Sequence, residues 1–368
     1  MEGDRQFDTT ILLLAVVLTC FGVVMVYSSS SIMAAERFHD GFYFLKRQGF
    51  YALAGFALLA LTLRIDYHRL RPLAVPGLML CAILLVLVLL PGIGTRAGGA
   101  ARWIRLGGFS IQPSEAVKLA LVFYMAHSLA KKQDKVKSFK LGILPYMIVL
   151  ALLLLLLLLQ PDLGSALTLG VLAMVMLMAA GTRVSHLVSL VVLAMPFLYY
   201  MVWHVDYRRR RILAFLDPWQ DPTDAGFQII QSLIAFGTGG LIGNGLGEGK
   251  QKLFYLPEAH TDFIFSVVGE ELGFAGTIVI TAMFLVLVMR GIRVSLQAPD
   301  DFGRYLAFGI TLLLGMEAFV NIAVVMGMLP TKGLALPFIS FGGTSLLTSL
   351  VAVGILLNVS SQTTGELQ

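Results

Sequence analysis

The stretch ALLLLLLLLQPDLGSALTLGVLAMVMLMAAG, residues 151–181, decides the fold class of this chain. It joins two apolar runs, near 142–159 and 164–180, each close to the roughly 20 residues that a helix needs to cross the hydrocarbon core of a bilayer. Only QPDL, residues 160–163, separates the runs, and a proline followed by a polar residue is typical of a tight turn. The stretch therefore predicts two membrane-spanning helices that are joined by a turn at one surface.

The composition extends this prediction to the whole chain. Of its 368 residues, 57% are hydrophobic and only 13% are charged, and the mean hydropathy of +0.83 lies outside the range of soluble globular proteins. The net charge of +5 is explained by loops that orient the chain or hold lipid phosphates, so we expect no nucleic acid partner. The first apolar run follows Met-Glu-Gly-Asp without a basic segment or a cleavage site, and we expect it to be retained as a span.

Apolar runs of this kind recur along the sequence and predict an all-α, polytopic membrane protein with about ten transmembrane helices. They form a single domain over residues 1–368, with one large extracytoplasmic loop at about 204–263. The candidate spans lie near 11–27, 48–63, 73–90, 114–130, 142–159, 164–180, 185–203, 264–289, 305–327 and 337–357.

Basic residues in the short loops set the predicted orientation. Loops 64–71, 131–140 and 290–304, together with Arg183, carry about twelve Lys and Arg residues, against about seven in the short loops of the opposite side. The first side is predicted to be cytoplasmic, and an even number of spans places both termini there. The basic residues on the outer side then need their own explanation, and a negatively charged ligand supplies one.

The first candidate constellation lies at the outer end of the fourth span. Arg102, Trp103 and Arg105 precede this span, and Glu115 and Lys118 lie one turn apart within it. Charged residues inside a span are costly and usually mark function. The alternative is structural: the tryptophan anchors the interface, and the pair at three-residue spacing fixes the helix against its neighbours.

Two further segments of the outer loop invite a phosphate-binding interpretation. Arg208 to Arg211 offer four guanidinium groups that suit the oxygens of a pyrophosphate, or equally the headgroups of anionic lipids. The glycine run 237–249 lacks the pattern of a P-loop, because Asn244 and Gln251 stand where glycine and a hydroxyl residue are required. We therefore interpret these glycines as flexible or closely packed backbone.

The segment LPEAHTDFIF, residues 256–265, places Glu258, His260 and Asp262 at alternate positions just before the eighth span. Three interpretations stay open on residue types alone. Thr261 or Asp262 caps the helix, a carboxylate at the membrane surface acts as a general base, or the three side chains bind a metal.

The last two spans carry polar residues as well. Glu317 and Asn321 lie four apart in the ninth span and suit a proton relay or a hydrogen bond to a neighbouring helix. The tenth span opens with PFISFGGTS, residues 337–345, whose small and hydroxyl residues favour close packing or an unwound turn.

Taken together, these segments resemble the SEDS family (shape, elongation, division and sporulation), nearly from end to end. PWQDP before Gly226-Phe227-Gln228, together with PTKG at 330–333, is similar to the division and sporulation members rather than to the elongation members. The matching stretches are ARWIRLGGFSIQPSEAVKL from Ala101, QPDLGSAL from Gln160, RRRRILAFLDPWQDPTDAGFQIIQSLIAFGTGGLIGNGLG from Arg208, LPEAHTDFIFSVVGEELG from Leu256 and LPTKGLALPFISFGGTSLL from Leu329.

This resemblance implies that the protein polymerises lipid II, the undecaprenyl-pyrophosphate-linked disaccharide peptide, into a β-1,4 glycan. It implies that Asp262 is the catalytic base, and no metal ligand is assigned. One base and several cations also suit an inverting displacement at an activated, phosphate-linked sugar. The residues expected to bind the substrate are Arg102, Trp103, Glu115, Lys118, Arg208, Arg210, Arg211, His260, Thr261, Lys332 and Ser340.

The resemblance also implies partners and a location. They are a class B penicillin-binding protein (a transpeptidase), other division proteins and membrane lipids, at the division site of a bacterial inner membrane. The only cofactor question left open is a divalent cation, Mg²⁺ or Mn²⁺. The main rival function is a lipid II flippase with Glu115, Lys118 and Glu317 along its path, and the third is a non-catalytic scaffold.

The predicted topology is testable by cysteine labelling in intact cells. Single cysteines placed at 135 and 295 are expected to resist a membrane-impermeant reagent, because the basic loops face the cytoplasm, whereas a cysteine at 225 reacts. The opposite pattern of labelling would invert the whole assignment.

Overall fold

The computed structural model describes residues 7–97, 100–106, 109–224, 226–253 and 256–363. Within them the chain is largely helical. The helices are α1 (Thr9–Phe38), α2 (Tyr43–Arg64), α3 (Tyr67–Leu70), α4 (Ala74–Leu89), α5 (Pro113–Lys131), α6 (Leu144–Leu159), α7 (Leu163–Ala179), α8 (Val184–Trp203), α9 (Asp206–Leu216), α10 (Phe227–Gly239), α11 (Ile264–Gln297), α12 (Asp301–Val325) and α13 (Gly343–Ser360). Short helical turns lie at Arg71–Leu73, Gln133–Lys135, Phe139–Ile143 and Pro218–Gln220.

Each of the ten expected spans coincides with one of the long helices. Seven helical segments of the described chain are long and apolar enough to cross a membrane, and α7 is a shorter apolar helix. The remaining two helices, α2 and α5, carry charged residues along their length: Lys46 and Arg47 near the start of α2, and Glu115 and Lys118 in α5. The polytopic all-α fold class is therefore confirmed.

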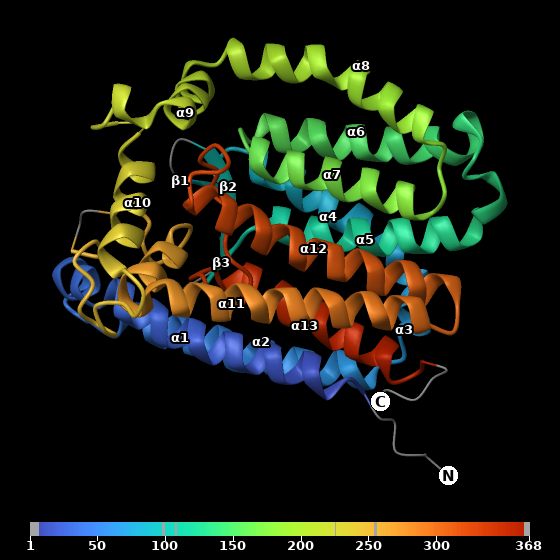
Figure 1. The fold of residues 1–368 in the computed structure, drawn as a ribbon. Helices are drawn as coiled ribbons and strands as arrows, with labels where there is room; N and C mark the ends of the chain where they lie inside the picture. The colour runs from blue at the N-terminus through green and yellow to red at the C-terminus, as the bar shows by residue number, and fades with distance from the viewer. Residues whose placement is uncertain (1–6, 98–99, 107–108, 225, 254–255, 364–368) are drawn as a thin grey trace.

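The long helices run side by side, and the loop that joins α8 to α11 lies at one end of the bundle with α9 and α10 (Figure 1). Both termini lie at the opposite end, as an even number of spans requires (Figure 1). We refer to the end that carries α9 and α10 as the outer end. Its extracytoplasmic orientation stays a prediction.

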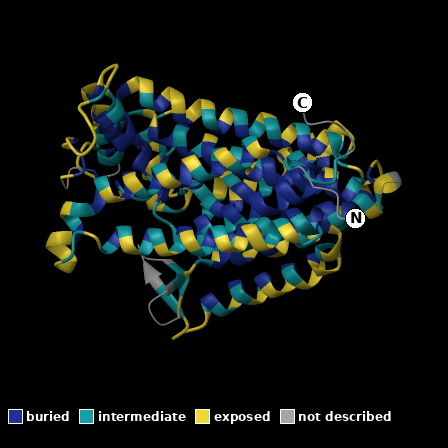
Figure 2. Cartoon of the chain, turned by 90° about the horizontal axis from the view of Figure 1, so that it is seen from below, coloured by how far each residue is buried: buried dark blue, intermediate teal, exposed yellow. Residues whose placement is uncertain are grey.

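The helices differ widely in how much of their surface packs against the protein. In α13, 78% of the most apolar window is buried, and in α12 61%, whereas in α8 only 6% is buried. Figure 2 shows the buried residues concentrated between the helices, with exposed residues on the outward faces. The large buried fractions place α12 and α13 in the interior of the bundle, and the small one places α8 at its periphery. The leucine, valine and isoleucine side chains that remain exposed are suited to contact with lipid hydrocarbon rather than water.

A three-stranded antiparallel sheet at the outer end is absent from the sequence expectation. Its strands are β1 (Gly94–Ala97), β2 (Ala100–Leu106) and β3 (Phe109–Ile111), in the order β1-β2-β3. The strands are only three to seven residues long and include three arginines, so they lack the extended alternation of apolar and polar residues that predicts a strand. The sheet matters here because β2 carries Arg102 and Trp103.

Two spans contain irregular backbone near the outer end. Residues 330–342 are not helical and α13 begins at Gly343, so the tenth span does not open as a helix at Pro337. Of the two alternatives for PFISFGGTS, close packing or an unwound turn, the structure shows an unwound turn over its first residues. The helix α11 is also interrupted at Gly273, where φ is 66° and ψ is −165°.

The unwound segment packs directly against the backbone of α1. A Cβ atom at Gly22 would lie 2.5 Å from the carbonyl oxygen of Phe338 and 2.6 Å from the Cα of Ile339. Both neighbours are backbone atoms, which cannot rotate away as a flexible side chain does. Glycine at this position therefore allows α1 to support the segment that contains Ser340.

Gly22→Ala is expected to destabilise the protein by about 1–3 kcal/mol, the usual cost of overpacking. The matched control is Gly77→Ala in α4, where a Cβ meets no atom within 4 Å. That change is expected to be neutral, or to stabilise by up to about 1 kcal/mol, since alanine restricts the unfolded chain. Thermal unfolding of both purified variants measures the difference, and equal melting temperatures would contradict this account of the contact.

Candidate functional site

The loop 256–263 at the outer end is held through three successive backbone carbonyl groups. The carbonyl of His260 accepts from the backbone N–H of Phe341 at 2.9 Å, and that of Thr261 accepts from the hydroxyl of Ser340 at 2.6 Å. The carbonyl of Asp262 accepts from the side-chain amide of Asn321 at 2.8 Å. Residues from α12 and from the unwound segment before α13 therefore fix the loop that presents Asp262.

Of the three interpretations of LPEAHTDFIF, the helix cap is wrong. The N-cap residue of α11 is Phe263, and no side chain makes a capping hydrogen bond there. No metal-binding group of three His, Cys, Asp or Glu side chains occurs among the described residues. The ring of His260 lies instead against Phe44, with ring centroids 4.6 Å apart, and near Phe341 at 5.8 Å.

The carboxyl group of Asp262 is half-buried and surrounded by charges from several elements. Burial raises the pKa of Asp262 to about 7, and the nearby carboxylate of Glu258 adds to the rise. The cations Arg211 and Arg102 act in the opposite direction, and Glu115 raises the pKa slightly. A carboxyl group with a pKa near neutrality is suited to exchange a proton with a bound hydroxyl group.

The turn QPDL, expected only as a connector, forms part of this site. Arg102 donates to the carbonyl oxygens of Pro161, at 2.5 Å, and Gln160, at 3.5 Å. Asp162 accepts from the backbone and the hydroxyl of Ser165 at the start of α7, at 3.0 and 2.8 Å. No residue of QPDL was on the expected list of substrate-binding residues, because its sequence indicates only a turn.

Lys332 lies between this turn and the Asp262 loop. Its ammonium group approaches the hydroxyl of Thr168 at 3.3 Å. Burial lowers the pKa of Lys332 to about 8, while the carboxylate of Asp162 opposes this. The next residue, Gly333, is so close to Asp262 that a Cβ there would lie 2.7 Å from the Oδ2 atom. The segment that carries Lys332 therefore contacts Asp262 through Gly333, while the ammonium group of Lys332 lies against α7.

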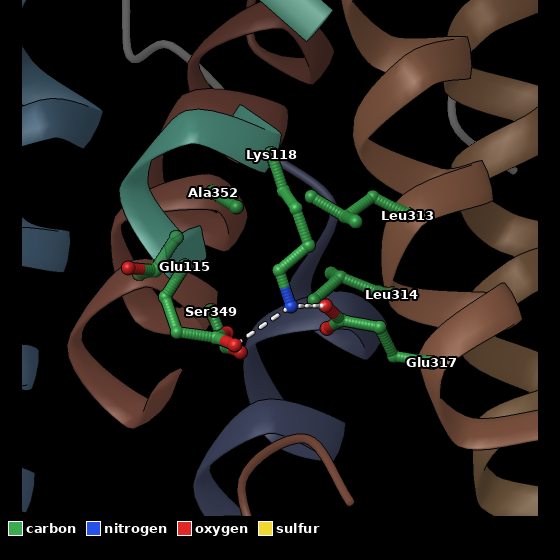
Figure 3. Close-up of a pocket in the computed structure, with 8 residues that line it drawn as sticks. Glu115, Lys118, Leu313, Leu314, Glu317, Ser349 and Ala352 are labelled. Atoms are coloured by element: carbon green, nitrogen blue, oxygen red, sulfur yellow. Dashed lines mark hydrogen bonds and ion pairs between the residues drawn. The ribbon is translucent and has the colours of Figure 1, made fainter. Parts of the chain in front are cut away.

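A buried ion triad lies deeper in the bundle (Figure 3). Lys118 of α5 is bonded to Glu115, at 2.9 Å, and to Glu317 of α12. The cavity beside the triad has a volume of only about 10 Å³, about that of one water molecule. The expected Glu115–Lys118 pair is thus present, with Glu317 as an additional partner.

The arginines of α9 are divided among different environments. Arg208 is buried and donates to Tyr207 and to the carbonyl of Met201, so the structure does not bring it to the site. Arg210 is exposed and faces Asp224 at 3.5 Å. Arg211 is the member that reaches inward, with its Nη1 atom 3.5 Å from the carbonyl oxygen of Thr331.

The remaining expected residues lie around the same loop. Trp103 is half-buried in β2, beside Arg102. Thr261 donates its hydroxyl to the Glu258 carboxylate at 2.7 Å, at the protein surface.

The residue that the sequence left ambiguous is Asn321, whose second hydrogen bond goes to the carbonyl of Leu334 at 2.6 Å. Its spacing from Glu317 was the only signal, and it gave no information on the partner.

Comparison with known proteins places this arrangement in a family. The sequence model of the FtsW/RodA/SpoVE family, described as cell cycle protein, matches residues 8–365. The chain belongs to this family. Among its relatives, a probable peptidoglycan glycosyltransferase FtsW of Geobacter metallireducens is 66% identical, over 99% of this chain and 97% of that protein. Stage V sporulation protein E of Bacillus subtilis is 43% identical, over 96% of each chain.

Solved structures of the FtsW/RodA/SpoVE type share the fold. A chain from a peptidoglycan synthase complex that coordinates polymerization and crosslinking has a TM-score of 0.80 and 31% identity, over 96% of this chain and 97% of that chain. RodA, the rod shape determining protein of Thermus thermophilus, has a TM-score of 0.72 and 26% identity, over 98% of each chain. The matches cover nearly all of this chain, so the outer end belongs to the shared fold.

Proposed function

We propose that this protein is a peptidoglycan glycosyltransferase that polymerises lipid II, with Asp262 as the general base. The proposal is supported by the family and by the names of its close relatives. The observation that carries it is the position of the Asp262 carboxyl group, which is held at the outer end with a raised pKa and with the cations Arg102 and Arg211 acting on it.

The chemistry assigns one task to each group. Asp262 accepts the proton of the 4-hydroxyl group of one lipid-linked disaccharide while that oxygen attacks the anomeric carbon of another. The bond from this carbon to the phosphate oxygen breaks, and undecaprenyl pyrophosphate leaves with the bonding electron pair. Arg102, Arg211 and Lys332 stabilise the negative charge of the pyrophosphates. Because the leaving group is already a weak base, no second carboxylic acid is needed to protonate it.

The buried ion triad argues against the flippase as the main function. Lys118 is bonded to both carboxylates, and the neighbouring cavity holds about one water molecule. A path for a lipid-linked sugar through the bundle would require a much larger polar space. We infer that the triad fixes α5 against α12 beneath the site, and thereby supports Asn321 one turn away.

The proposed setting follows from the family. A class B penicillin-binding protein and other division proteins are the proposed partners, and the division site of the bacterial inner membrane is the proposed location. The base and the cations of the site account for the reaction without a resident metal. Addition of Mg²⁺ or Mn²⁺ to the purified complex determines whether a divalent cation contributes to binding of the pyrophosphate.

Replacing Asp262 by Asn tests the base directly. Asp262→Asn is expected to lower the rate of glycan synthesis by about 100- to 10,000-fold, because an amide cannot accept the proton. The fold, the partner complex and lipid II binding should persist. Glycan strands made from purified lipid II are separated on a gel, and Glu248→Gln is the matched control, because Glu248 is an exposed carboxylate of the outer loop that is not among the charges acting on Asp262. Well-folded Asp262→Asn protein with a near wild-type rate would exclude this role.

The pH dependence of the wild-type rate follows from the same pKa. Asp262 acts as a base only when ionised, so with its pKa at about 7 the rate should rise with pH and level off above that value. Asp262→Asn should lose this limb of the profile.

Arg211 is tested against a neighbour on the same helix. Arg211→Glu is expected to weaken the use of lipid II by about tenfold or more, because it replaces a cation near Asp262 with an anion. The control is Arg209→Glu, since Arg209 is exposed and pairs with Asp206 at 3.1 Å. Polymerisation measured over a range of lipid II concentrations distinguishes the two variants, and equal effects would remove Arg211 from the site.

A further inference from the structure

The interruption of α11 at Gly273 is filled by the glycine run that the sequence left without a function. In an uninterrupted helix the N–H groups of Phe274 and Ala275 would bond to the carbonyls of Glu270 and Glu271. Here the segment 240–245 pairs all four groups. The bonds run from Asn244 N to Glu270 O at 3.1 Å, from Gly245 N to Glu271 O at 3.0 Å, from Phe274 N to Gly240 O at 2.9 Å and from Ala275 N to Leu241 O at 3.1 Å.

This backbone contact is possible only because the facing residues are glycines. Gly243 has φ of +87° and Gly273 has φ of +66°, a region that other residues rarely adopt. A Cβ at Gly273 would lie 2.4 Å from the nitrogen of Gly243, and a Cβ at Gly243 would lie 2.2 Å from the carbonyl oxygen of Glu271. The glycine run is thus closely packed backbone, one of the two interpretations that its sequence allowed.

The side chains of the same two glutamates hold the residues that follow the glycine run. The carboxylate of Glu270 accepts from the backbone N–H groups of Lys250, at 2.8 Å, and Gln251, at 3.1 Å. The carboxylate of Glu271 pairs with the ammonium group of Lys252 at 2.7 Å and accepts from Ser28 of α1 at 2.7 Å. Both carboxylates and Lys252 are buried, so these charge-assisted bonds are not weakened by water.

These contacts determine where the Asp262 loop begins. Residues 250–252 are attached to the seventh and eighth residues of α11, and the loop returns to the first residue of the same helix, Ile264. Leu256 is bonded back to Gln251 through its N–H at 2.9 Å. The loop that presents Asp262 is therefore fixed to α11 at both of its ends.

We propose that Glu270 and Glu271 are positioning residues for glycosyl transfer, because they hold segment 250–252 on α11 and so fix the Asp262 loop. We call this contact the α11 dock, defined by Glu270, Glu271 and residues 240–252. The inference rests on the proposed function, because it assigns to the α11 dock the placement of Asp262, the proposed general base. Neither glutamate touches the substrate in this account, and their effect passes through Asp262.

The pH profile separates positioning from simple stability. The charged groups that act on Asp262 are Glu258 of its own loop, Arg211 of α9, Arg102 of β2 and Glu115 of α5. None of them belongs to the α11 dock. Burial is the largest cause of the raised pKa of Asp262, so water that enters a loosened loop lowers this pKa. A variant that merely unfolds more easily leaves the pKa of its folded molecules unchanged.

The experiment compares Glu270→Gln and Glu271→Gln with Glu248→Gln in the full-length protein. Glu248 is an exposed glutamate of the same segment, and its side chain takes no part in the bonds that join residues 240–252 to α11. In the two dock variants we expect kcat for lipid II polymerisation per folded molecule to fall by about 100-fold. KM should change little, and the pH of half-maximal rate should move down. If Glu271→Gln alone gives too little folded protein, the double variant Glu271→Gln/Lys252→Gln is used instead, because it replaces the buried ion pair with two neutral side chains.

Hydrogen exchange of residues 256–263 gives a readout that does not depend on activity. It should accelerate in both dock variants and stay unchanged in Glu248→Gln. Unchanged exchange in the folded dock variants would overturn the inference, as would a loss of rate with the same half-maximal pH. Failure of wild-type protein to polymerise lipid II would refute the proposed function instead, and the exchange comparison would still test the dock.

Discussion

The side-chain amide of Asn321 is the contact on which the outer end of this protein depends. One nitrogen donates to the carbonyl oxygens of Asp262 and Leu334, and so joins α12 to the two irregular segments of the site. Irregular backbone packed among membrane-spanning helices has little access to water, so it is stable only where protein donors satisfy it. The position of the Asp262 carboxyl group follows from this requirement.

Irregular backbone at the outer end is satisfied in the same way elsewhere. The glycine segment fills the interruption of α11, Arg102 donates to the carbonyls of the QPDL turn, and Ser340 donates to the loop beside Asp262. Each of these contacts joins segments that are far apart in the sequence. The candidate site is consequently built on fixed backbone, which would keep the groups of the proposed reaction in place before a substrate binds.

Charge is distributed by depth. In the interior, Lys118 pairs with the carboxylates of Glu115 and Glu317, so each buried charge has a partner of opposite sign, as expected for charges that cannot be hydrated. At the outer end, the cations Arg102, Arg211 and Lys332 lie among the carboxyl groups of Asp162, Glu258 and Asp262, and the proposed function assigns the phosphates of the substrate to these cations.

The sequence by itself determined the membrane class, the positions of the ten helical runs, the family and the residue types of the site. Those features follow from the length of apolar runs and from local motifs, which do not depend on contacts between distant segments of the chain. Only the tertiary structure decided that Arg208 points away from the site while Arg211 reaches it, and that Glu317 and Asn321 have different partners. It also revealed the small sheet and the paired glycines of the α11 dock. Neighbouring residues of one helix face different surroundings, and backbone bonds between distant segments leave no pattern in the sequence, so no local signal could have predicted them.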